Sequence, residues 1–380
     1  MRPLFIGLIS GTSMDGVDAA LVDCSGPEPR LAATHKGEYS EELAARLRAA
    51  AQSKGECELA EAAALDAEVA AAFAETALAL QGGAGCDADQ IEAIGSHGQT
   101  LWHAPDAHPP HTVQIGSPAR VAALSGMVTV GDFRAADMAL GGQGAPLAPV
   151  FHQWLFGRSG ETRAVVNIGG IANLSVLAGD GGVTGYDTGP GNTLLDSWAR
   201  TCRGEAYDEN GQWARSGQVN AGLLERLLSD DFFSAPAPKS TGPELFNLHW
   251  LERAGISDKA PEDVQATLLD LTAASIAGAV RVSCAGAALA VCGGGASNSF
   301  LMERLTANCP ESSPVTTEAW GVHPDWVEAA GFALLARARL RREPGNEPAV
   351  TGASRALPLG GVFLPSPNHP GAPDARIGRP

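Results

Sequence analysis

Short apolar runs separated by small or polar residues define the beginning of the chain. Residues 4–9 and 17–23 are apolar runs, and the connection between them is bounded by Gly11 and Gly16. Runs of this length beside glycine turns predict β-strands, here a hairpin with a long turn. From about 41 to 81 the sequence is rich in Ala, Leu and Glu with a break near Lys54, which predicts two helices.

The same order of strand, glycine turn and strand returns at 165–176. A hairpin repeated at the head of each half indicates an internally duplicated chain with two α/β domains. Downstream, 264–284 predicts a well-patterned helix, and the apolar run "ALAVC" predicts a buried strand that ends in glycines. Helices are also expected at 299–307 and 327–342.

Proline and glycine are frequent between 105 and 146, so this stretch is loop-rich and favours a domain boundary near 130. The residues after 343 again carry many Pro and Gly. We therefore expect a first domain at 1–130, a second at 131–345, and a tail, 346–380, that packs back on the first domain.

Composition narrows the class of protein. The 380 residues exceed the usual size of one hydrophobic core, and 44% of them are apolar. A formal net charge of -17 disfavours nucleic-acid and anionic-membrane surfaces, so neither partner is expected. The seven cysteines form no C-x-x-C pair, which indicates reduced thiols, and no signal peptide or membrane span is recognised. A cytoplasmic protein is expected.

Glycine-rich turns are the candidate phosphate sites, because they leave backbone N–H groups free to face an anion. The chain has no G-x-x-x-x-G-K-[ST] motif and no complete G-x-G-x-x-G. The first hairpin turn, Ser10 to Asp18, could surround a phosphate or could be an ordinary turn. Asn167 to Gly170 repeats it, and "CGGG" at 292–295 lies between a strand and a helix, a position suited to nucleotide contact. Each glycine cluster taken singly has a structural explanation as good as the functional one.

Asp187 is the carboxylate whose placement most suggests catalysis. It follows an apolar strand and precedes "TGPGN", so it could serve as a general base, or it could cap the helix that starts near Asn192. His97 is interpreted as a hydrogen-bonding loop residue, because the spacing of the nearby histidines fits no zinc pattern. Arg134 and Asp137 could hold a polar ligand or pair with each other on the surface.

Ten motifs in order carry a resemblance to a known family. They include "SGTSMDGVDAALVD", "IGSHGQTLWH", "GDFRAADMALGGQGAPLAP", "VVNIGGIANLSVL", "YDTGPGNTLLD", "VCGGGASNSFLMERL" and "HPDWVEAAGFALLA". From about residue 5 to about 361 the chain closely resembles the anhydro-N-acetylmuramic acid kinases of bacterial cell-wall recycling. The resemblance implies a two-domain α/β sugar kinase and actin-like (ribonuclease H-like) fold with a central ATP cleft.

The resemblance also implies the reaction. 1,6-Anhydro-N-acetylmuramic acid, ATP and water would give N-acetylmuramic acid 6-phosphate and ADP, with Mg²⁺ offsetting charge on the phosphoryl oxygens. Asp187 resembles the general base that activates the water. Sugar contacts are implied for His97, Arg134, Asp137 and Glu328. ATP contacts are expected from Gly11, Thr12, Ser13, Met14, Asp15, Gly16, Val17, Asp18, Gly169, Gly170, Asn192, Gly293, Gly294 and Gly295.

Asp15 is also a candidate contact for Mg²⁺ or its waters, and a homodimer is a candidate assembly. One departure from the family pattern is Pro243, where an Arg is expected after Thr241-Gly242. Two other functions stay open: a kinase or phosphohydrolase of the same superfamily acting on another ligand, and an actin-like nucleotide-binding protein without sugar chemistry. Fold alone does not separate them.

Overall fold

The computed structural model describes residues 3–53, 55–237 and 239–366, and the chain divides into two compact units. Unit 1 contains the chain up to Leu155 and again from Glu328 onward, whereas unit 2 is the single segment Phe156–Val327. The boundaries expected at 130 and 345 therefore lie elsewhere. The end of the expected tail, 367–380, is outside the described residues.

Contacts of helix α5 (Ala148–Phe156) explain why the first boundary falls later than expected. The Phe151 ring lies so close to Gly331 that a Cβ there would overlap it, and it also faces the Phe332 ring at a centroid distance of 6.3 Å. Gly331 and Phe332 belong to helix α13 (Val327–Arg341). Residues after 130 therefore bury apolar surface against the returning chain, and the Pro- and Gly-rich stretch is a loop within unit 1.

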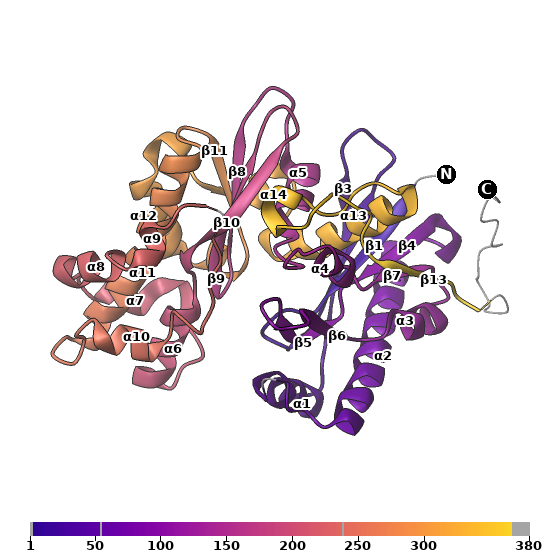
Figure 1. Cartoon of the computed structure of the whole chain (residues 1–380), viewed down its shortest axis with the longest axis horizontal. Helices are drawn as coiled ribbons and strands as arrows, with labels where there is room; N and C mark the ends of the chain where they lie inside the picture. Colours follow the sequence, from indigo (N-terminus) through magenta and orange to yellow (C-terminus); the bar gives the residue numbers. More distant parts are fainter. Residues whose placement is uncertain (1–2, 54, 238, 367–380) are drawn as a thin grey trace. The chain divides into compact units, whose positions relative to one another are not determined.

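The sheet of unit 1 has the order β13-β7-β4-β1-β2-β3 (Figure 1). Strands β1, β2 and β3 form an antiparallel meander, β4 and β7 continue parallel to β1, and β13 pairs antiparallel with β7. Their bounds are β1 (Leu4–Ile9), β2 (Gly16–Asp23), β3 (Arg30–Glu38), β4 (Ile91–Ser96), β7 (Thr129–Gly131) and β13 (Gly361–Phe363).

Both faces of this sheet are covered, which explains why every residue of β1 is buried. Alternate residues such as Ile6 and Leu8 share a core with helix α2 (Leu59–Ala84) and with α1 (Glu41–Gln52). On the opposite face, α13 crosses so closely that a Cβ on Gly7 or Gly95 would overlap its backbone carbonyls. Glycine at these two positions is what lets α13 lie against the centre of the sheet.

Unit 2 repeats the arrangement, with the order β10-β9-β8-β11-β12. Strands β8 (Arg163–Ile168), β9 (Ile171–Leu177) and β10 (Val183–Pro190) form the meander, and β11 (Ala288–Cys292) and β12 (Val315–Thr316) continue parallel to β8. The hairpin repeated in the sequence is thus the first hairpin of each sheet. A meander extended by parallel strands beyond its first strand is the ribonuclease H-like topology, so the expected α/β fold class is confirmed.

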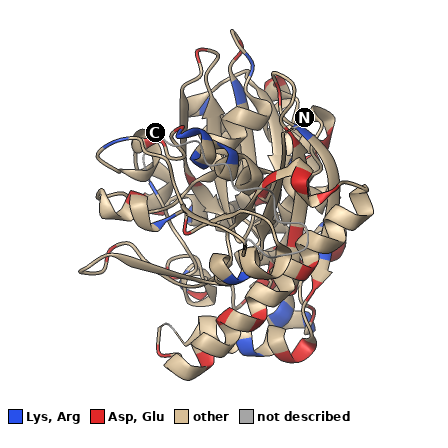
Figure 2. Ribbon diagram, turned by 90° about the vertical axis from the view of Figure 1, so that its right-hand side faces the viewer, with Lys and Arg blue, Asp and Glu red and all other residues tan. Residues whose placement is uncertain are grey.

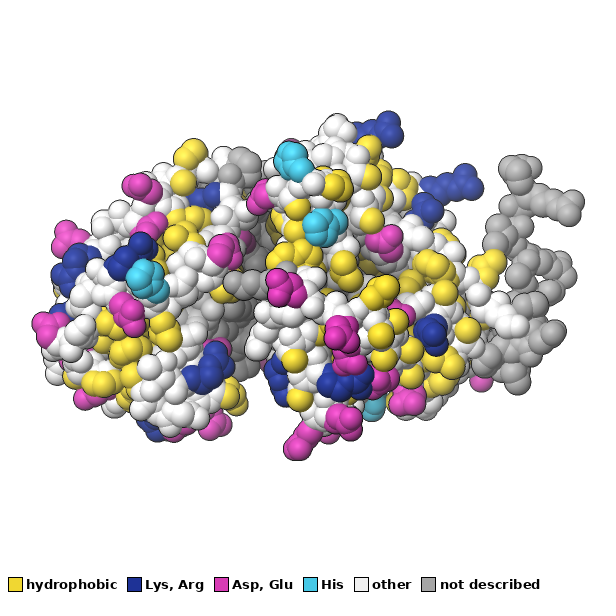
Figure 3. Space-filling model, turned by 60° about the horizontal axis from the view of Figure 1, so that its bottom comes forward, with side chains coloured by type: hydrophobic (Ala, Val, Ile, Leu, Met, Phe, Trp, Pro, Cys, Tyr) yellow, Lys and Arg dark blue, Asp and Glu magenta, His cyan; other side chains and the backbone are white. Residues whose placement is uncertain are grey.

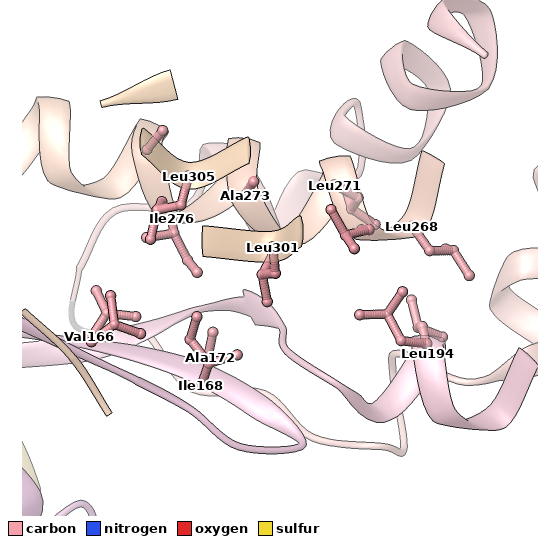
Figure 4. Packing of buried hydrophobic residues seen from close by; sticks show 14 of the residues in the cluster. Val166, Ile168, Ala172, Leu194, Leu268, Leu271, Ala273, Ile276, Leu301 and Leu305 are labelled. Carbon is pink, nitrogen blue, oxygen red and sulfur yellow. The ribbon is translucent and has the colours of Figure 1, made fainter. Parts of the chain in front are cut away.

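Helices α11 (Pro261–Ser283) and α12 (Ser299–Asn308) contribute apolar side chains to the core of unit 2. In Figure 4, Leu301 of α12 and Ile276 of α11 point toward Ile168 and Ala172 of the sheet. By length and hydropathy α11 could cross a membrane, yet 67% of its apolar window is buried. The helix is a core element of the unit.

The remaining elements are shorter. In unit 1 they are the two-stranded sheet β5 (Gln99–Ala104) and β6 (His111–Ile115), and the helices α3 (Pro118–Ser125), α4 (Ala135–Ala139) and α14 (Pro348–Thr351). In unit 2 they are α6 (Thr193–Arg203), α7 (Gln212–Ser216), α8 (Ala221–Leu228), α9 (Asp231–Ser234) and α10 (Leu248–Arg253). Six short 3-10 turns connect these elements along the described residues.

Charged residues are distributed along the chain. Figure 2 shows acidic and basic positions interspersed on the helices, and Figure 3 shows acidic side chains spread over one face with basic ones among them. Some are locally paired, such as Arg46, which binds both Glu61 and Glu68. Because the chain carries a net charge of -17, binding of an anion would have to depend on local geometry.

Candidate functional site

The turn between β1 and β2 is the first candidate phosphate site. Gly11 faces open space, because a Cβ placed there would meet no atom within 4 Å. Gly16 differs, since its Cβ would overlap the carbonyl of Gly37 on β3. Gly16 is therefore required by the sheet, whereas Gly11 has no such structural requirement. Open space in front of a glycine backbone is what close approach of a phosphate needs.

The other residues predicted for this turn divide between its tip and the strand. Thr12 and Ser13 are exposed at the tip, where the N–H of Met14 donates to the carbonyl of Gly11 at 3.2 Å. The Met14 side chain is buried, so only its backbone can face a ligand. Val17 is buried and Asp18 is half-buried, both inside β2. The turn can thus offer backbone N–H groups and the exposed hydroxyl of Thr12.

Asp15 is already engaged by neighbouring side chains. Its Oδ1 accepts a hydrogen bond from Ser13 Oγ at 2.6 Å, and its Oδ2 lies 2.8 Å from Lys36 Nζ. Burial acts to raise the pKa of Asp15, but the hydrogen bonds from Lys36 and Ser13 outweigh it and the pKa is lowered. Among the described residues no three His, Cys, Asp or Glu side chains gather as a metal site. Asp15 could therefore contact Mg²⁺ only as a single carboxylate or through the waters of the ion.

The turn between β8 and β9 in unit 2 is held against the start of α6. The N–H of Asn192 donates to the carbonyl of Gly169 at 2.8 Å, and the N–H of Thr193 donates to the carbonyl of Gly170 at 3.0 Å. A Cβ on Gly169 or Gly170 would find its nearest neighbour at 3.6 or 3.9 Å, so both glycines have room in front of them. The β8–β9 turn is thus rigidly placed and accessible.

The glycine run after β11 contains two kinds of position. Gly293 has a φ of +76° and lies against Asn167, and a Cβ on Gly295 would overlap the Ile168 side chain. The fold therefore requires glycine at both positions. A Cβ on Gly294, in contrast, would meet only Asn192 Nδ2, at 3.9 Å. Gly294 faces space that the protein leaves empty.

That space is a pocket of about 410 Å³ within unit 2. Gly294 and Asn192 line it, together with Asp196 of α6 and Tyr207 and Asn298. The sequence prediction included Gly294 and Asn192 but missed the other three, although the "YDENGQW" and "GASN" segments both contribute. The pocket thus joins segments that are distant in the sequence.

Carboxylates form part of the pocket wall, contributed by Asp196, Asp208 and Glu209. Burial raises the pKa of Asp196 to about 6, with Arg200 opposing and Asp208 adding to the increase. Negative charge here would repel a phosphate group, whereas carboxylate oxygens accept hydrogen bonds from hydroxyl and amino groups. The pocket suits an uncharged, hydrogen-bonding part of a ligand.

Asp187 lies near the end of β10, where the pairing with β9 shifts register between Asp187 and Gly189. Its backbone N–H donates to the carbonyl of Lys239 at 3.1 Å, and its Oδ2 accepts from the N–H of Thr241 at 3.0 Å. The residue before α6 that acts as N-cap is Asn192, so the capping interpretation of Asp187 is wrong. The "KST" segment instead fixes the orientation of this carboxylate.

The surroundings of Asp187 make it a stronger base than an exposed carboxylate. Burial raises its pKa to about 6; the N–H of Thr241 opposes the shift and the charge of Glu244 adds to it. The Asp187 side chain is half-buried, and among the described residues only its Oδ2 is occupied by a hydrogen bond. Its Oδ1 is left available to a water molecule. Pro243 lies in the same loop, where its carbonyl accepts from Asn247 Nδ2 at 3.1 Å.

In unit 1, the buried His97 pairs with the half-buried Arg134. Arg134 Nε donates to His97 Nε2 at 3.2 Å, and His97 Nδ1 lies 3.0 Å from the carbonyl of Gly98. These partners fix the tautomer with the proton on Nδ1. Burial and the neighbouring Arg134 charge hold the pKa of His97 well below its usual value. His97, which also stacks on Phe332 at 4.6 Å, is therefore neutral near pH 7 and serves as a hydrogen-bonding residue.

Glu328, the first residue of the returning chain, belongs to the same group. Desolvation of its carboxyl group raises its pKa, Arg134 lowers it and Asp18 raises it further, while the residue as a whole stays exposed to solvent. Burial lowers the pKa of Arg134 to about 10, against the attraction of Glu328 and Asp137. The structure thus brings together three of the four residues predicted to contact the sugar: His97, Arg134 and Glu328.

Asp137, the fourth, is placed differently from the prediction. Its side chain is 0% exposed, and it accepts hydrogen bonds from the N–H of Gly144, from Asn346 Nδ2 and from Thr351 Oγ1, at 2.8, 2.6 and 2.7 Å. A sugar cannot reach a carboxylate enclosed in this way. Nor does Asp137 pair with Arg134 at the surface, since Asp137 is buried and each of the two side chains has its own hydrogen-bond partners. Asn346 and Thr351 are partners that the sequence did not reveal.

Comparison with known proteins places the chain among relatives of the same length. Residues 3–365 match the family model described as "Anhydro-N-acetylmuramic acid kinase". A protein of that name from Saccharophagus degradans is 46% identical over 96% of this chain and 100% of its own length. One from Shewanella loihica is 49% identical over 94% of this chain and 98% of its own length.

Solved structures give more distant matches. The activator of 2-hydroxyisocaproyl-CoA dehydratase from Clostridium difficile, with bound ADPNP, is 13% identical over 89% of this chain and 96% of its own, with a TM-score of 0.45. A ROK hexokinase from Thermus thermophilus is 16% identical over 87% of this chain and 97% of its own, with a TM-score of 0.37.

Proposed function

The chain belongs to the anhydro-N-acetylmuramic acid kinase family, and from this premise we propose that it converts 1,6-anhydro-N-acetylmuramic acid, ATP and water into N-acetylmuramic acid 6-phosphate and ADP. The observation that carries the proposal is the match over residues 3–365, which includes Asp187 and every glycine turn described above. The reaction would recycle a peptidoglycan fragment. Because it consumes ATP, we also propose a cytoplasmic location.

Asp187 is proposed as the general base that starts the reaction. Its Oδ1 accepts a proton from water, and the water oxygen forms a bond to the anomeric carbon as the bond from that carbon to O6 breaks. O6 leaves with the electron pair and attacks the γ-phosphorus, whose bond to the bridging oxygen of ADP then breaks. A pKa of about 6 suits this role, because the carboxylate is ionised near pH 7 and is still a stronger base than usual.

Three open glycines are proposed to bind ATP. Gly11 and Gly170 have open space beside their backbone, which lets a phosphate come close to the turns that they belong to, and Gly294 opens onto the pocket of unit 2. The acidic pocket beside Gly294 takes the uncharged nucleoside end, because carboxylates repel phosphates and accept hydrogen bonds from hydroxyl or amino groups. The residues expected beside the phosphates thus differ in charge from those expected beside the nucleoside.

Mg²⁺, when bound, would offset charge on the phosphoryl oxygens. Asp15 stays a candidate contact for Mg²⁺ or its waters, although Lys36 and Ser13 already bind its carboxylate, and we derive no step through the metal. The sugar contacts are assigned to His97, Arg134 and Glu328. Charged Arg134 supplies hydrogen bonds. Neutral His97, whose two ring nitrogens bind Arg134 and the carbonyl of Gly98, orients that guanidinium and offers its ring as a contact surface. Neither residue takes up a proton during the reaction.

The decisive test is ADP release with a panel of sugars. We expect 1,6-anhydro-N-acetylmuramic acid to support turnover at least about a hundredfold above ordinary hexoses, because a hydroxyl-bearing sugar gives Asp187 no bridge to open. The reaction is followed by coupled ADP detection and mass spectrometry, and in H₂¹⁸O one label should appear at C1 after correction for anomeric exchange. ADP release that is equal with every sugar, or independent of sugar, would contradict the proposal and favour one of the two rival functions.

The pH dependence of kcat/KM for the sugar should have one acidic limb. Asp187 must be ionised to accept a proton, so activity should rise with pH, bend at about pH 6 and then level off toward neutrality. His97 should add no second limb, because its pKa is held well below the ordinary value. The profile is measured at constant ionic strength with folding checked by circular dichroism. A flat profile across this range would contradict the assigned base.

A further inference from the structure

The chain after α13 wraps around the loop that follows α4. The N–H of Gln143 donates to the carbonyl of Thr351 at 2.8 Å, and the N–H of Ser354 donates to the carbonyl of Leu140 at 3.0 Å. We call residues 345–357 the C-terminal strap and residues 140–144 the glycine loop. The two segments are far apart in the sequence and are bound together by backbone hydrogen bonds at Thr351 and at Ser354.

Asp137 lies at the centre of this contact. Its Oδ1 accepts from both Asn346 and Thr351 of the strap, and its Oδ2 accepts from the N–H of Gly144 in the glycine loop. Asn346 is in turn fixed, because its Oδ1 accepts from the N–H of Leu357 at 2.8 Å. One fully buried carboxylate therefore joins both segments. Each of its three donors would lose a partner if it were removed.

Gly144 transmits this contact to Arg134. Its N–H is held by Asp137, and its carbonyl accepts from Arg134 Nη1 at 2.7 Å. Gly144 also has a φ of +69°, and a Cβ would crowd Met138 and Arg134, so the loop has little freedom to rearrange. The guanidinium of Arg134 is thus fixed on one side by Gly144 and on the other by His97.

We propose that Asp137 is a positioning residue, and that the C-terminal strap sets the orientation of Arg134 in the sugar site through Asp137 and Gly144. The position of the Gly144 carbonyl sets the direction in which the remaining N–H donors of Arg134 point. Loosening the strap lets Gly144 move, and the guanidinium moves with it. The inference rests on the proposed function only for the identity of the sugar, since the contacts from strap to Arg134 stand on their own.

Thr351→Val is the main test, because it removes one hydroxyl donor from Asp137 at nearly constant volume. We expect the KM for the sugar to increase about tenfold, since small displacements of a binding group are costly, and the KM for ATP to stay within about twofold. Thr351→Ser restores the donor and should restore the sugar KM. Ser125→Ala is the matched control, because it removes another buried hydroxyl of unit 1, bonded to Met127 at 3.2 Å, outside the strap.

A second readout does not depend on the sugar. In the ligand-free protein the ¹⁵N resonance of His97 Nε2, assigned by its loss in His97→Gln, reports the hydrogen bond from Arg134. Thr351→Val should shift this resonance, and Thr351→Ser and Ser125→Ala should leave it unchanged. If the wild-type chain fails to use the anhydro sugar, the proposed function fails, and the resonance still tests the strap.

The result that would overturn the inference is equally specific. If Thr351→Val lowers the melting temperature as Ser125→Ala does, but leaves both the sugar KM and the His97 resonance unchanged, Asp137 has only a structural role. Asp137→Asn gives a second check when it folds, because an amide cannot accept all three hydrogen bonds. An unchanged sugar KM in a folded Asp137→Asn protein would likewise overturn the inference.

Discussion

Asp187→Asn is expected to lower kcat by three or more orders of magnitude while the protein still binds ATP and sugar. The amide has the size of the carboxylate, and its oxygen can accept the hydrogen bond that the N–H of Thr241 donates to Asp187. It cannot accept a proton from water. General acid–base catalysis contributes a rate enhancement of about 10²- to 10⁴-fold, which is lost with the base. Phosphoryl transfer is lost too, because it can follow only after the base has started the reaction.

The same substitution should stabilise the fold near pH 7. The pKa of Asp187 is raised from 3.8 to about 6 in the folded chain, so the unfolded chain loses the proton first as the pH rises. Stability contributed by the protonated form is therefore present below about pH 4 and is lost as the pH rises through about 6, a difference of about 3 kcal/mol. Asn carries no such cost, so its melting temperature should exceed that of the wild type at pH 7 and match it near pH 4.

Calorimetric binding, coupled ADP release and thermal melting on one preparation measure all three effects. Asp180→Asn is the matched control, because Asp180 is an exposed carboxylate in the turn that precedes β10, bonded only to the N–H of Gly182 at 3.0 Å. It should keep normal turnover and normal stability. Turnover within tenfold of the wild type in Asp187→Asn would remove the general-base assignment.

Gly294→Val is expected to increase the KM for ATP by about a hundredfold or more without changing the melting temperature. The fold tolerates a side chain at Gly294, since its φ is not positive and a Cβ there would meet only Asn192 Nδ2, at 3.9 Å. The added methyl groups instead enter the pocket that is proposed to take the nucleoside end of ATP. Displacing a ligand from contacts worth several kcal/mol accounts for the size of the effect.

Two other glycines of unit 2 make this test specific. Gly295→Val should lose stability, because its side chain would overlap Ile168. Gly278→Val in α11 should change the free energy of unfolding by no more than about 1 kcal/mol and should leave ATP binding unchanged. The reason is that no atom lies within 4 Å of a Cβ at this position. Steady-state kinetics and thermal melts of the three variants distinguish a loss of ATP binding from a loss of stability caused by a steric clash in the core. A normal ATP KM in Gly294→Val would contradict the assignment of the pocket.

The sequence predicted the local parts of the fold well. The hairpin at 165–176, the helix at 264–284 and the strand before the glycine run depend on apolar periodicity within a few residues, and each has its counterpart in the structure. The first domain boundary was misplaced because it depends on a non-local contact. Nothing near Phe151 in the sequence indicates that it packs against α13.

The candidate site shows the same division. The position of Asp187 could be predicted, because a carboxylate at a strand end before a glycine turn is a local pattern. The role of Asp137 could not, because its partners Asn346 and Thr351 are 209 and 214 residues away. Without them, an acidic residue beside Arg134 is easily interpreted as a ligand contact. Likewise Asp196 and Asn298 meet in one pocket only after folding.

The discontinuity of unit 1 has a consequence for the chain as it is synthesised. Unit 2 is continuous and can fold once Val327 has left the ribosome, but the sheet of unit 1 still lacks α13 over Gly7 and Gly95 at that moment. The strap that holds Asp137 emerges later still. An incomplete chain therefore exposes an apolar sheet face and cannot fix Arg134, so sugar binding is acquired at the end of translation.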